Sequence, residues 1–144
     1  MLKSEKMKLI YNDKPDQKDQ KYLDEKLMGF NGNRIKGYVF KSFLYKMIDD
    51  SGLMIAGIDC IVGGGWLEII SLWVSEHNRK KKIGENLLFE AERTAKEKGC
   101  HSSYLYSYSF QAPAFYEKKG YKIFGVLENY YQNHSKLYMK KRLV

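Results

Sequence analysis

The stretch LWVSEHNRKKKIGENLL, residues 72–88, decides how this chain of 144 residues is expected to fold. It runs from an apolar strand, through a loop with four consecutive cations at residues 79–82, into an amphipathic helix that begins at Ile83. Because the start of a helix leaves backbone N–H groups unpaired and carries partial positive charge, it attracts phosphate. The cations beside it strengthen that attraction. The stretch therefore predicts a site for a phosphate-bearing ligand.

The elements around this stretch follow a simple order. Hydrophobic periodicity and turn residues predict strands over residues 7–11, 38–48, 53–62, 66–74, 102–108, 121–126 and 134–143. They predict helices from Pro15 to Gly29, over residues 83–98, and from a cap at Ser109 to Lys119. An antiparallel meander followed by one right-handed crossover gives an α/β (α+β) fold, a mixed, mostly antiparallel sheet of about seven strands with helices on both faces. Residues 1–144 are expected to form a single domain.

Composition limits the classes of protein to which the chain could belong. With 44% apolar and 29% charged residues, it is typical of a soluble globular protein. No apolar run approaches the roughly 20 residues of a membrane helix, and the polar first residues do not resemble a secretory signal. We therefore expect a cytoplasmic protein with no membrane partner. Cys60, Cys100 and the three histidines lack the spacing of a metal site, so no metal is expected.

Two motifs in the chain resemble those of a known enzyme family. The spacing Arg79-x-x-Lys82-x-Gly84 is one residue away from Gln/Arg-x-x-Gly-x-Gly/Ala. That pattern is the pyrophosphate-binding signature of the GNAT superfamily, the acyl-CoA-dependent N-acyltransferases. Residues 109–121 are similar to the family segment Asn-x-x-Ala-x-x-x-Tyr-x-x-x-Gly-Phe/Tyr, which they match at Ala112, Tyr116, Gly120 and Tyr121. The family has the order of elements given above, so the resemblance covers essentially the whole chain.

The resemblance implies acetyl-CoA as the co-substrate. Its pyrophosphate would lie at the loop and the first helical turn, against Arg79, Lys80, Lys81, Lys82, Ile83, Gly84 and Glu85. The pantetheine arm would run along Leu72, Trp73 and Val74 and reach Ser109, which stands where the family often has Asn. Lys82 stands where the family pattern has Gly. If that residue needs a positive φ, a lysine there costs about 1 kcal/mol.

The resemblance also implies the catalytic groups. Tyr116 would be the general acid that protonates the departing CoA thiolate, a role that an ordinary tyrosine pKa of about 10 permits. Glu68 would be the base that deprotonates the amine, and by alternation it shares a face with Trp66, Ile70, Leu72 and Val74. A backbone N–H of residues 72–74 would polarise the thioester carbonyl. Tyr116 could instead be one more core tyrosine among 12, and Glu68 a strand-edge charge that reaches solvent.

The favoured function is transfer of the acetyl group of acetyl-CoA to a primary amine. We expect direct transfer in a ternary complex, because neither cysteine adjoins a recognisable base. One alternative, motivated by Lys82, is a degenerate GNAT domain that binds CoA or acts as a regulator. A nucleic-acid-binding domain is less favoured: the net charge of +8 suits it, but no helix-turn-helix, RNP-like or zinc signature supports it. No nucleic-acid partner is therefore expected.

The sequence does not identify the acceptor, which could be a small molecule or a peptide. Residues 128–134, ENYYQNH, resemble the Tyr-Pro-x-Gly-His turn of a small bacterial subgroup of the family. They could line the acceptor pocket, with His134 as a proton shuttle, or they could form a structural loop. An edge strand at the C-terminus could pair between subunits, so a homodimer is an open prediction.

Overall fold

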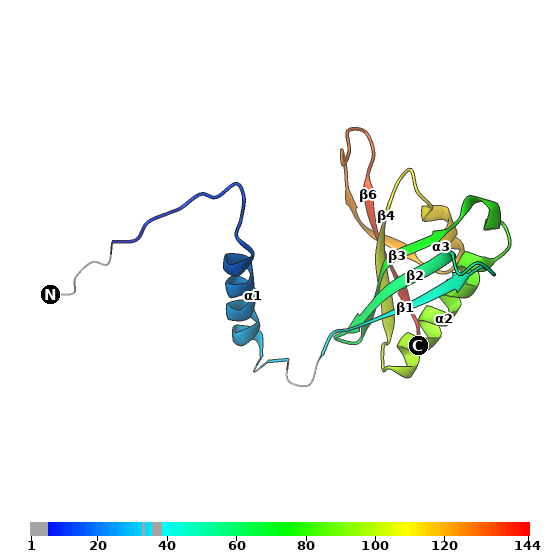
Figure 1. Cartoon of the computed structure of the whole chain (residues 1–144), viewed down its shortest axis with the longest axis horizontal. Helices are drawn as coiled ribbons and strands as arrows, with labels where there is room; N and C mark the ends of the chain where they lie inside the picture. The colour runs from blue at the N-terminus through cyan, green and yellow to red at the C-terminus, as the bar shows by residue number, and fades with distance from the viewer. Residues whose placement is uncertain (1–5, 33, 36–38) are drawn as a thin grey trace. The chain divides into compact units, whose positions relative to one another are not determined.

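The structure is a computed structural model that describes residues 6–32, 34–35 and 39–144 (Figure 1). It consists of two compact units, residues 1–37 and 38–144. Each unit has its own set of internal contacts. The single domain expected over residues 1–144 stays a prediction.

The first unit contains the helix α1 (Gln17–Asn31). Its start is fixed by Asp16, whose carboxylate accepts a hydrogen bond of 2.9 Å from the Lys18 amide and so caps the first turn. The helix ends at Asn31, two residues beyond the predicted Gly29. The strand predicted over residues 7–11 is wrong, because this segment has no regular secondary structure. Five alternating residues become a strand only when a neighbouring strand completes their hydrogen bonds.

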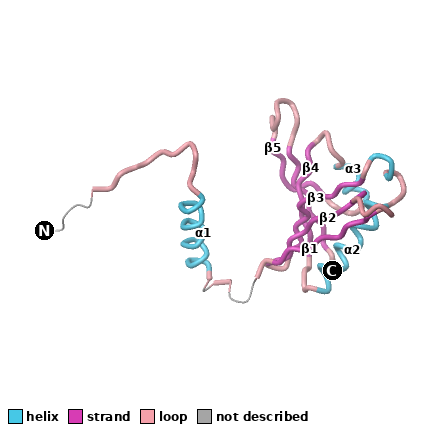
Figure 2. Tube along the Cα trace, in the orientation of Figure 1, coloured by secondary structure: helices cyan, strands magenta, loops and turns pink. Residues whose placement is uncertain are grey.

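The second unit is built on a sheet, whose strands are magenta in Figure 2. The spatial order of the strands is β1-β2-β3-β4-β6-β5. Its strands are β1 (Lys41–Ile48), β2 (Met54–Gly63), β3 (Trp66–Val74), β4 (Ser102–Tyr108), β5 (Lys122–Leu127) and β6 (Lys136–Arg142). β3 and β4 run parallel, as the crossover predicts, and the other neighbouring pairs are antiparallel. The mixed, mostly antiparallel sheet is confirmed, with six strands in the described residues because residues 7–11 do not pair. The predicted first residue of β1, Tyr38, lies outside the described residues.

The C-terminal strand β6 does not lie at an edge of the sheet, which corrects the prediction. It pairs with β4 from Ser102↔Arg142 to Tyr108↔Lys136 and with β5 on its other side. Full-length pairing with β4 holds β6 in the interior, so that β1 and β5 form the edges. Pairing of two subunits through β6 would therefore require it to leave a neighbour, and the homodimer stays a prediction.

The core lies between the sheet and α2 (Ile83–Glu97). The apolar stripe predicted for this helix is confirmed, since its buried residues are Leu87, Leu88, Ala91 and Ala95. They pack in one cluster with alternate residues of β2 and β3, namely Ala56, Ile58, Cys60, Val62, Leu67 and Ile69. The short helix α3 (Pro113–Lys118) adds Tyr116 to this cluster. A 3-10 turn, Glu76–Asn78, begins the connection from β3 to α2.

A β-bulge at Ile70 interrupts the alternation of β3. Ile69 pairs with Cys60 and Ser71 with Asp59, which leaves Ile70 without a partner on β2. The prediction that Glu68, Leu72 and Val74 share a face is therefore wrong. The extra residue reverses the alternation, so Leu72 and Val74 pack against the core cluster. The bulge also bends β3 away from β4, and the two strands pair only as far as Glu68↔Tyr104.

A buried polar network ties α2 to β4 and β6. The Tyr121 hydroxyl donates to Glu92 at 3.1 Å and lies 2.8 Å from the Ser103 hydroxyl. Lys141 binds both oxygens of the Glu92 carboxylate, at 3.0 and 2.8 Å. Burial, together with the Glu92 charge, raises the pKa of Tyr121 far above its usual range, so the phenol remains a donor.

We expect Tyr121→Phe to lower the free energy of unfolding by about 1–3 kcal/mol, because Ser103 is fully buried and would lose a partner. Urea unfolding of the variant measures this loss. In a double-mutant cycle with Glu92→Gln, the two changes should be less than additive. Full additivity would show that the network does not act as a unit.

Candidate functional site

A cleft of about 690 Å³ opens where β3 and β4 separate. One wall is the end of β3, the second is the loop and first turn of α2, and the third is the segment from β4 into α3. The residues that line it are Leu72, Trp73, Val74, Asn78, Arg79, Lys80, Lys82, Ile83, Gly84, Glu85, Phe110, Gln111, Ala112, Phe115 and Tyr116. The structure thus brings together ten of the predicted cofactor-binding residues. Of the predicted set, Lys81 and Ser109 are outside this lining.

The first turn of α2 presents backbone N–H groups at this cleft. At the start of α2, the Asn86 amide donates a hydrogen bond of 3.0 Å to the Lys82 carbonyl. The amides of residues 83–85 precede that bond, as in any helix start, and their residues line the cleft. Such a cluster of donors, with the partial positive charge of the helix, fits a phosphate group.

The charged side chains of the loop differ in what they contact. Arg79 donates from Nε to the Val74 carbonyl at 3.1 Å, and Lys81 contacts Asn78 at 3.5 Å. Glu85 is paired with Lys119 at 2.7 Å, and this hydrogen bond and charge lower the pKa of the Glu85 carboxyl. The acid in the first helical turn is thereby neutralised, which reduces its repulsion of a phosphate.

Lys82 adopts the left-handed backbone conformation, with the positive φ that makes a lysine unfavourable at this position. Its φ and ψ are 61° and 16° at the start of α2, and Lys80 has the same φ of 61°. A residue with a Cβ is strained in this region, by about 1 kcal/mol, and glycine is not. The loop therefore holds two lysines in positions that favour glycine.

We expect Lys82→Gly to raise the free energy of unfolding by about 0.5–1 kcal/mol, although glycine also gains entropy in the unfolded chain. Chemical denaturation measures the change. Lys81→Gly is the matched control, since Lys81 is not among the positive-φ residues and its replacement should not stabilise. Equal effects of the two substitutions would remove backbone strain as the explanation.

Tyr116 projects from α3 into the same cleft and is largely buried. Burial, and then the neighbouring Cys60 thiol, raise the pKa of Tyr116 to about 12. The phenol is thus fully protonated at neutral pH, but it is a weaker acid than an exposed tyrosine. It suits hydrogen-bond donation to a developing thiolate better than complete proton transfer.

Ser109 does not cap α3, which corrects the prediction. The residue before the helix is Ala112, and its side chain makes no cap. The Ser109 hydroxyl instead accepts a 3.0 Å hydrogen bond from the Ser135 amide, while its own amide donates to the Ser135 carbonyl at 2.9 Å. The helix begins only at Pro113, so Ser109 lies too far before its first turn to accept from the free amides there.

Glu68 lies outside the lining of the cleft. It pairs in register with Tyr104, at the last point where β3 and β4 are joined. Burial of Tyr104, and then its hydrogen bond to Glu68, raise the pKa of Tyr104 to about 12. Beyond this point, at Ile70 and Ser71, β3 is separated from β4.

A second cavity of about 320 Å³ lies there, between the separated strands. It is lined by residues 69–72 of β3 and 105–108 of β4. It shares Leu72, Gln111, Ala112 and Tyr116 with the larger cleft. The two cavities therefore adjoin each other, and Tyr116 lies in the walls of both.

The sequence did not single out several lining residues. Phe110 and Phe115 supply apolar walls, and the Gln111 side chain accepts a 2.8 Å hydrogen bond from the Tyr108 amide, which fixes the turn after β4. These three residues lie within the motif of residues 109–121, at positions that do not match the family pattern. Asn78 lies in the turn before the cations and had no such signal.

Comparison with known proteins agrees with this architecture. The sequence model of the Acetyltransferase (GNAT) family matches residues 5–121. Blasticidin-S acetyltransferase of Streptomyces morookaense is 33% identical over 82 residues, which span 56% of this chain and about 60% of that protein's length. The crystal structure of an acetyltransferase from Bacillus cereus ATCC 14579 is 33% identical, with a TM-score of 0.86 over 94% of this chain and 97% of that one. An aminoglycoside 6'-N-acetyltransferase complexed with coenzyme A has the same fold at 19% identity, with a TM-score of 0.65 over 96% and 98% of the chains.

The chain belongs to the acetyltransferase (GNAT) family. In the described part of the chain, no helix combines the length and apolar character that crossing a membrane requires. Nor do the described residues gather three His, Cys, Asp or Glu side chains into a group that could hold a metal ion.

Proposed function

We propose that this chain is an N-acetyltransferase that transfers the acetyl group of acetyl-CoA directly to a primary amine in a ternary complex. The observation that carries the proposal is the pair of cavities that meet at Tyr116. The larger cavity is lined by cations and by the first turn of α2, and the smaller one by residues of β3 and β4. Two reactants held from opposite ends would react as a positioned pair, which supplies much of the acceleration.

The residues of the larger cleft divide between two parts of the co-substrate. The amides of residues 83–85, with Lys80 and Lys82, would hold the pyrophosphate. Beyond Glu68↔Tyr104 the edge of β3 that faces β4 pairs with no strand of the described residues, so the backbone of Leu72 to Val74 can bind an extended amide-containing arm. An N–H of this edge would polarise the thioester carbonyl as negative charge develops on its oxygen.

The chemistry requires that an N–C bond forms as the C–S bond breaks. The amine loses one proton, and the departing sulfur gains a hydrogen bond or a proton. Tyr116 would donate that hydrogen bond. Complete transfer from a phenol of pKa about 12 to a thiolate of pKa about 8.5 is unfavourable, so its contribution is charge stabilisation.

Glu68 is proposed as the group that accepts the amine proton. The proton would pass through a water molecule, because Glu68 lines neither cavity. We expect Glu68→Gln to lower kcat/KM about tenfold well below the pKa of the amine, where the amine is protonated. The loss should vanish at higher pH, where the amine is already neutral. A pH–rate profile measures both limbs, and an unchanged acidic limb would leave water as the sole acceptor.

Calorimetric titration with CoA, followed by thiol release from acetyl-CoA in the presence of an amine library, tests the proposed function. An N-acetyltransferase gives heat in the first experiment and turnover in the second. Heat without turnover would favour a CoA-binding module, the alternative that the strained Lys82 suggests. No heat would overturn the proposal.

A further inference from the structure

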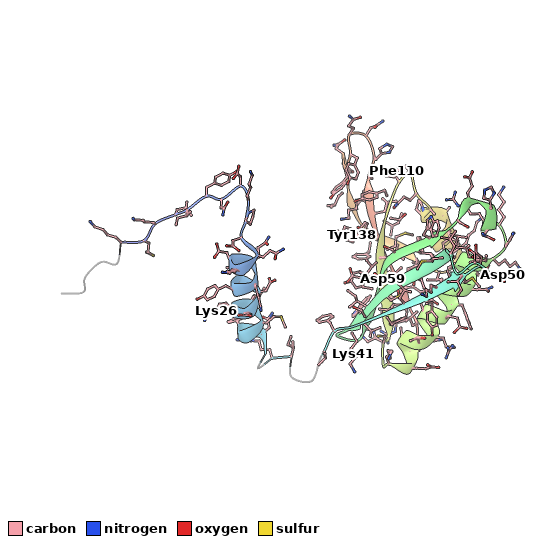
Figure 3. All side chains as sticks on the ribbon, in the orientation of Figure 1. Lys26, Lys41, Asp50, Asp59, Phe110 and Tyr138 are labelled. Carbon is pink, nitrogen blue, oxygen red and sulfur yellow. The ribbon has the colours of Figure 1, made fainter. Side chains whose placement is uncertain are left out.

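An aromatic cluster surrounds the far end of the smaller cavity. We define it as Tyr106, Tyr108, Phe110, Tyr130, Tyr131 and Tyr138. Tyr108 is its centre, with the rings of Phe110, Tyr130 and Tyr131 at centroid distances of 5.4, 5.5 and 5.3 Å. Figure 3 shows Phe110 beyond β4 and Tyr138 on β6. Tyr106 and Tyr108 line the smaller cavity and Phe110 lines the larger, so the cluster adjoins both.

Several of these rings are exposed rather than packed in the core. Tyr106 is 44% exposed, Phe110 is 55% exposed and Tyr131 is 62% exposed. Aromatic rings gathered at the mouth of a cavity are a surface on which a planar ligand can stack. The volume of the smaller cavity, about 320 Å³, is at the low end of the range for small-molecule sites.

The loop that carries two of the rings is strained. Asn129, Tyr131 and Gln132 have φ values of 54°, 55° and 66°. A bulky residue such as tyrosine is rare in this region, and each such residue costs about 1–3 kcal/mol. The hydrogen bonds between Ser109 and Ser135 anchor the loop to the end of β4. The fold thus holds Tyr131 beside Tyr108 against the backbone preference of a tyrosine.

One cation lies within this cluster. The Lys136 ammonium is 3.9 Å from the ring centroid of Tyr106, 5.2 Å from that of Tyr130 and 5.5 Å from that of Tyr138. The salt bridges found among the described residues do not include Lys136. An acidic group on a ligand would therefore find a cation held in place by the rings, whereas a polycationic amine would be repelled.

We propose that the aromatic cluster binds the acceptor, and that this acceptor is an amine with an aromatic ring and a carboxylate, the chemistry of an aromatic amino acid. The ring stacks on the exposed faces of Phe110 and Tyr131, and the carboxylate pairs with Lys136. The amine then enters the smaller cavity towards Tyr116. This inference rests on the proposed function and adds the class of substrate to it.

Four acceptors test the proposal in the thiol-release assay. Tryptophan has both features, tryptophan amide lacks the carboxylate, leucine lacks the aromatic ring, and spermidine is a polycation. We expect kcat/KM to be highest for tryptophan, by about tenfold or more over leucine and spermidine. Tyr131→Leu should lower the value for tryptophan more than that for leucine.

The carboxylate contact is tested with Lys136→Gln. This variant should lower kcat/KM for tryptophan about tenfold and leave that for tryptophan amide nearly unchanged. For each compound, kcat/KM of the variant is divided by kcat/KM of the unaltered protein, because the different basicity of the two amines then cancels. Lys140→Gln is the matched control, since Lys140 is exposed on the same strand and lies over Phe124 instead.

Faster turnover of leucine or spermidine than of tryptophan would overturn the proposal, as would a Lys136→Gln variant that treats both tryptophan compounds alike. If no acceptor is turned over, equilibrium dialysis of tryptophan against the CoA-loaded protein decides. Binding that Lys136→Gln weakens supports the cluster, and no binding overturns it. Failure of the proposed function is recognised separately, because CoA titration then gives no heat, and the inference falls with it.

Discussion

Gly84→Val is expected to reduce the affinity for CoA by at least about 100-fold while leaving the fold intact. A Cβ added at Gly84 would lie 3.6 Å from Val74 and 3.8 Å from Phe115, which are ordinary contacts. All three residues line the cleft, so the two methyl groups of valine would occupy the space beside the amides of the first turn. The loss of one or two charge-assisted hydrogen bonds, at about 1.5–3 kcal/mol each, gives a factor of this size.

Calorimetric titration with CoA measures the effect, and circular dichroism and thermal unfolding report on the fold. Asn86→Val is the matched control, because Asn86 is exposed, lies in the same helical turn and is outside the cleft. Gly84→Ala should fall between the two, since its single methyl group fits without strain. Unaltered CoA binding by Gly84→Val would mean that the phosphates lie elsewhere.

The elements with strong periodic signals could be predicted from the sequence, and those that depend on pairing could not. α2 begins at the predicted Ile83. Its start could be predicted because four cations precede the helix, and a glycine in its first turn is followed by a regular apolar stripe. The strands β3 and β4 have the predicted bounds, for a similar reason. The segment 7–11 has the alternation of a strand but no partner, and alternation alone does not supply hydrogen bonds.

The bulge at Ile70 shows a second limit. Nothing in the composition of β3 marks it, because a bulge belongs to the register between two strands and not to either sequence. It nevertheless decides the site, since it turns Leu72 and Val74 towards the core and begins the separation from β4. Regular alternation predicts that Glu68 shares a face with Leu72 and Val74, and the bulge breaks this alternation.

The candidate site was predictable where one segment supplies it and less so where several meet. The run of residues 79–85 lines the cleft except at Lys81, whose ammonium contacts Asn78. Ser109 lies outside the cleft lining, and its hydroxyl accepts a hydrogen bond from the Ser135 amide, 26 residues away, so its contact with the cofactor stays a prediction. Contacts at such separations depend on the closed sheet and leave no local pattern.

Tyr116→Phe is expected to lower kcat about 100-fold while changing the affinity for CoA less than about twofold. The hydroxyl contributes a hydrogen bond to the departing sulfur only as the C–S bond breaks, so its removal affects the transition state and not the bound ground state. Single-turnover kinetics measure the first quantity and calorimetry the second. Because burial raises the pKa of Tyr116 to about 12, the unaltered enzyme should show no loss of activity from this group at pH 9–10, about two units lower.

The matched control for this prediction is Tyr121→Phe. Burial also raises the pKa of Tyr121, but its hydroxyl contacts Glu92 and Ser103, and it lines neither cavity. A merely structural tyrosine would lower stability when changed and leave kcat per folded molecule as it was, and this is the behaviour expected of Tyr121. If Tyr116→Phe behaves in the same way, with kcat unchanged, the departing thiolate is stabilised by solvent, and the meeting point of the two cavities is a passage and not the centre of the reaction.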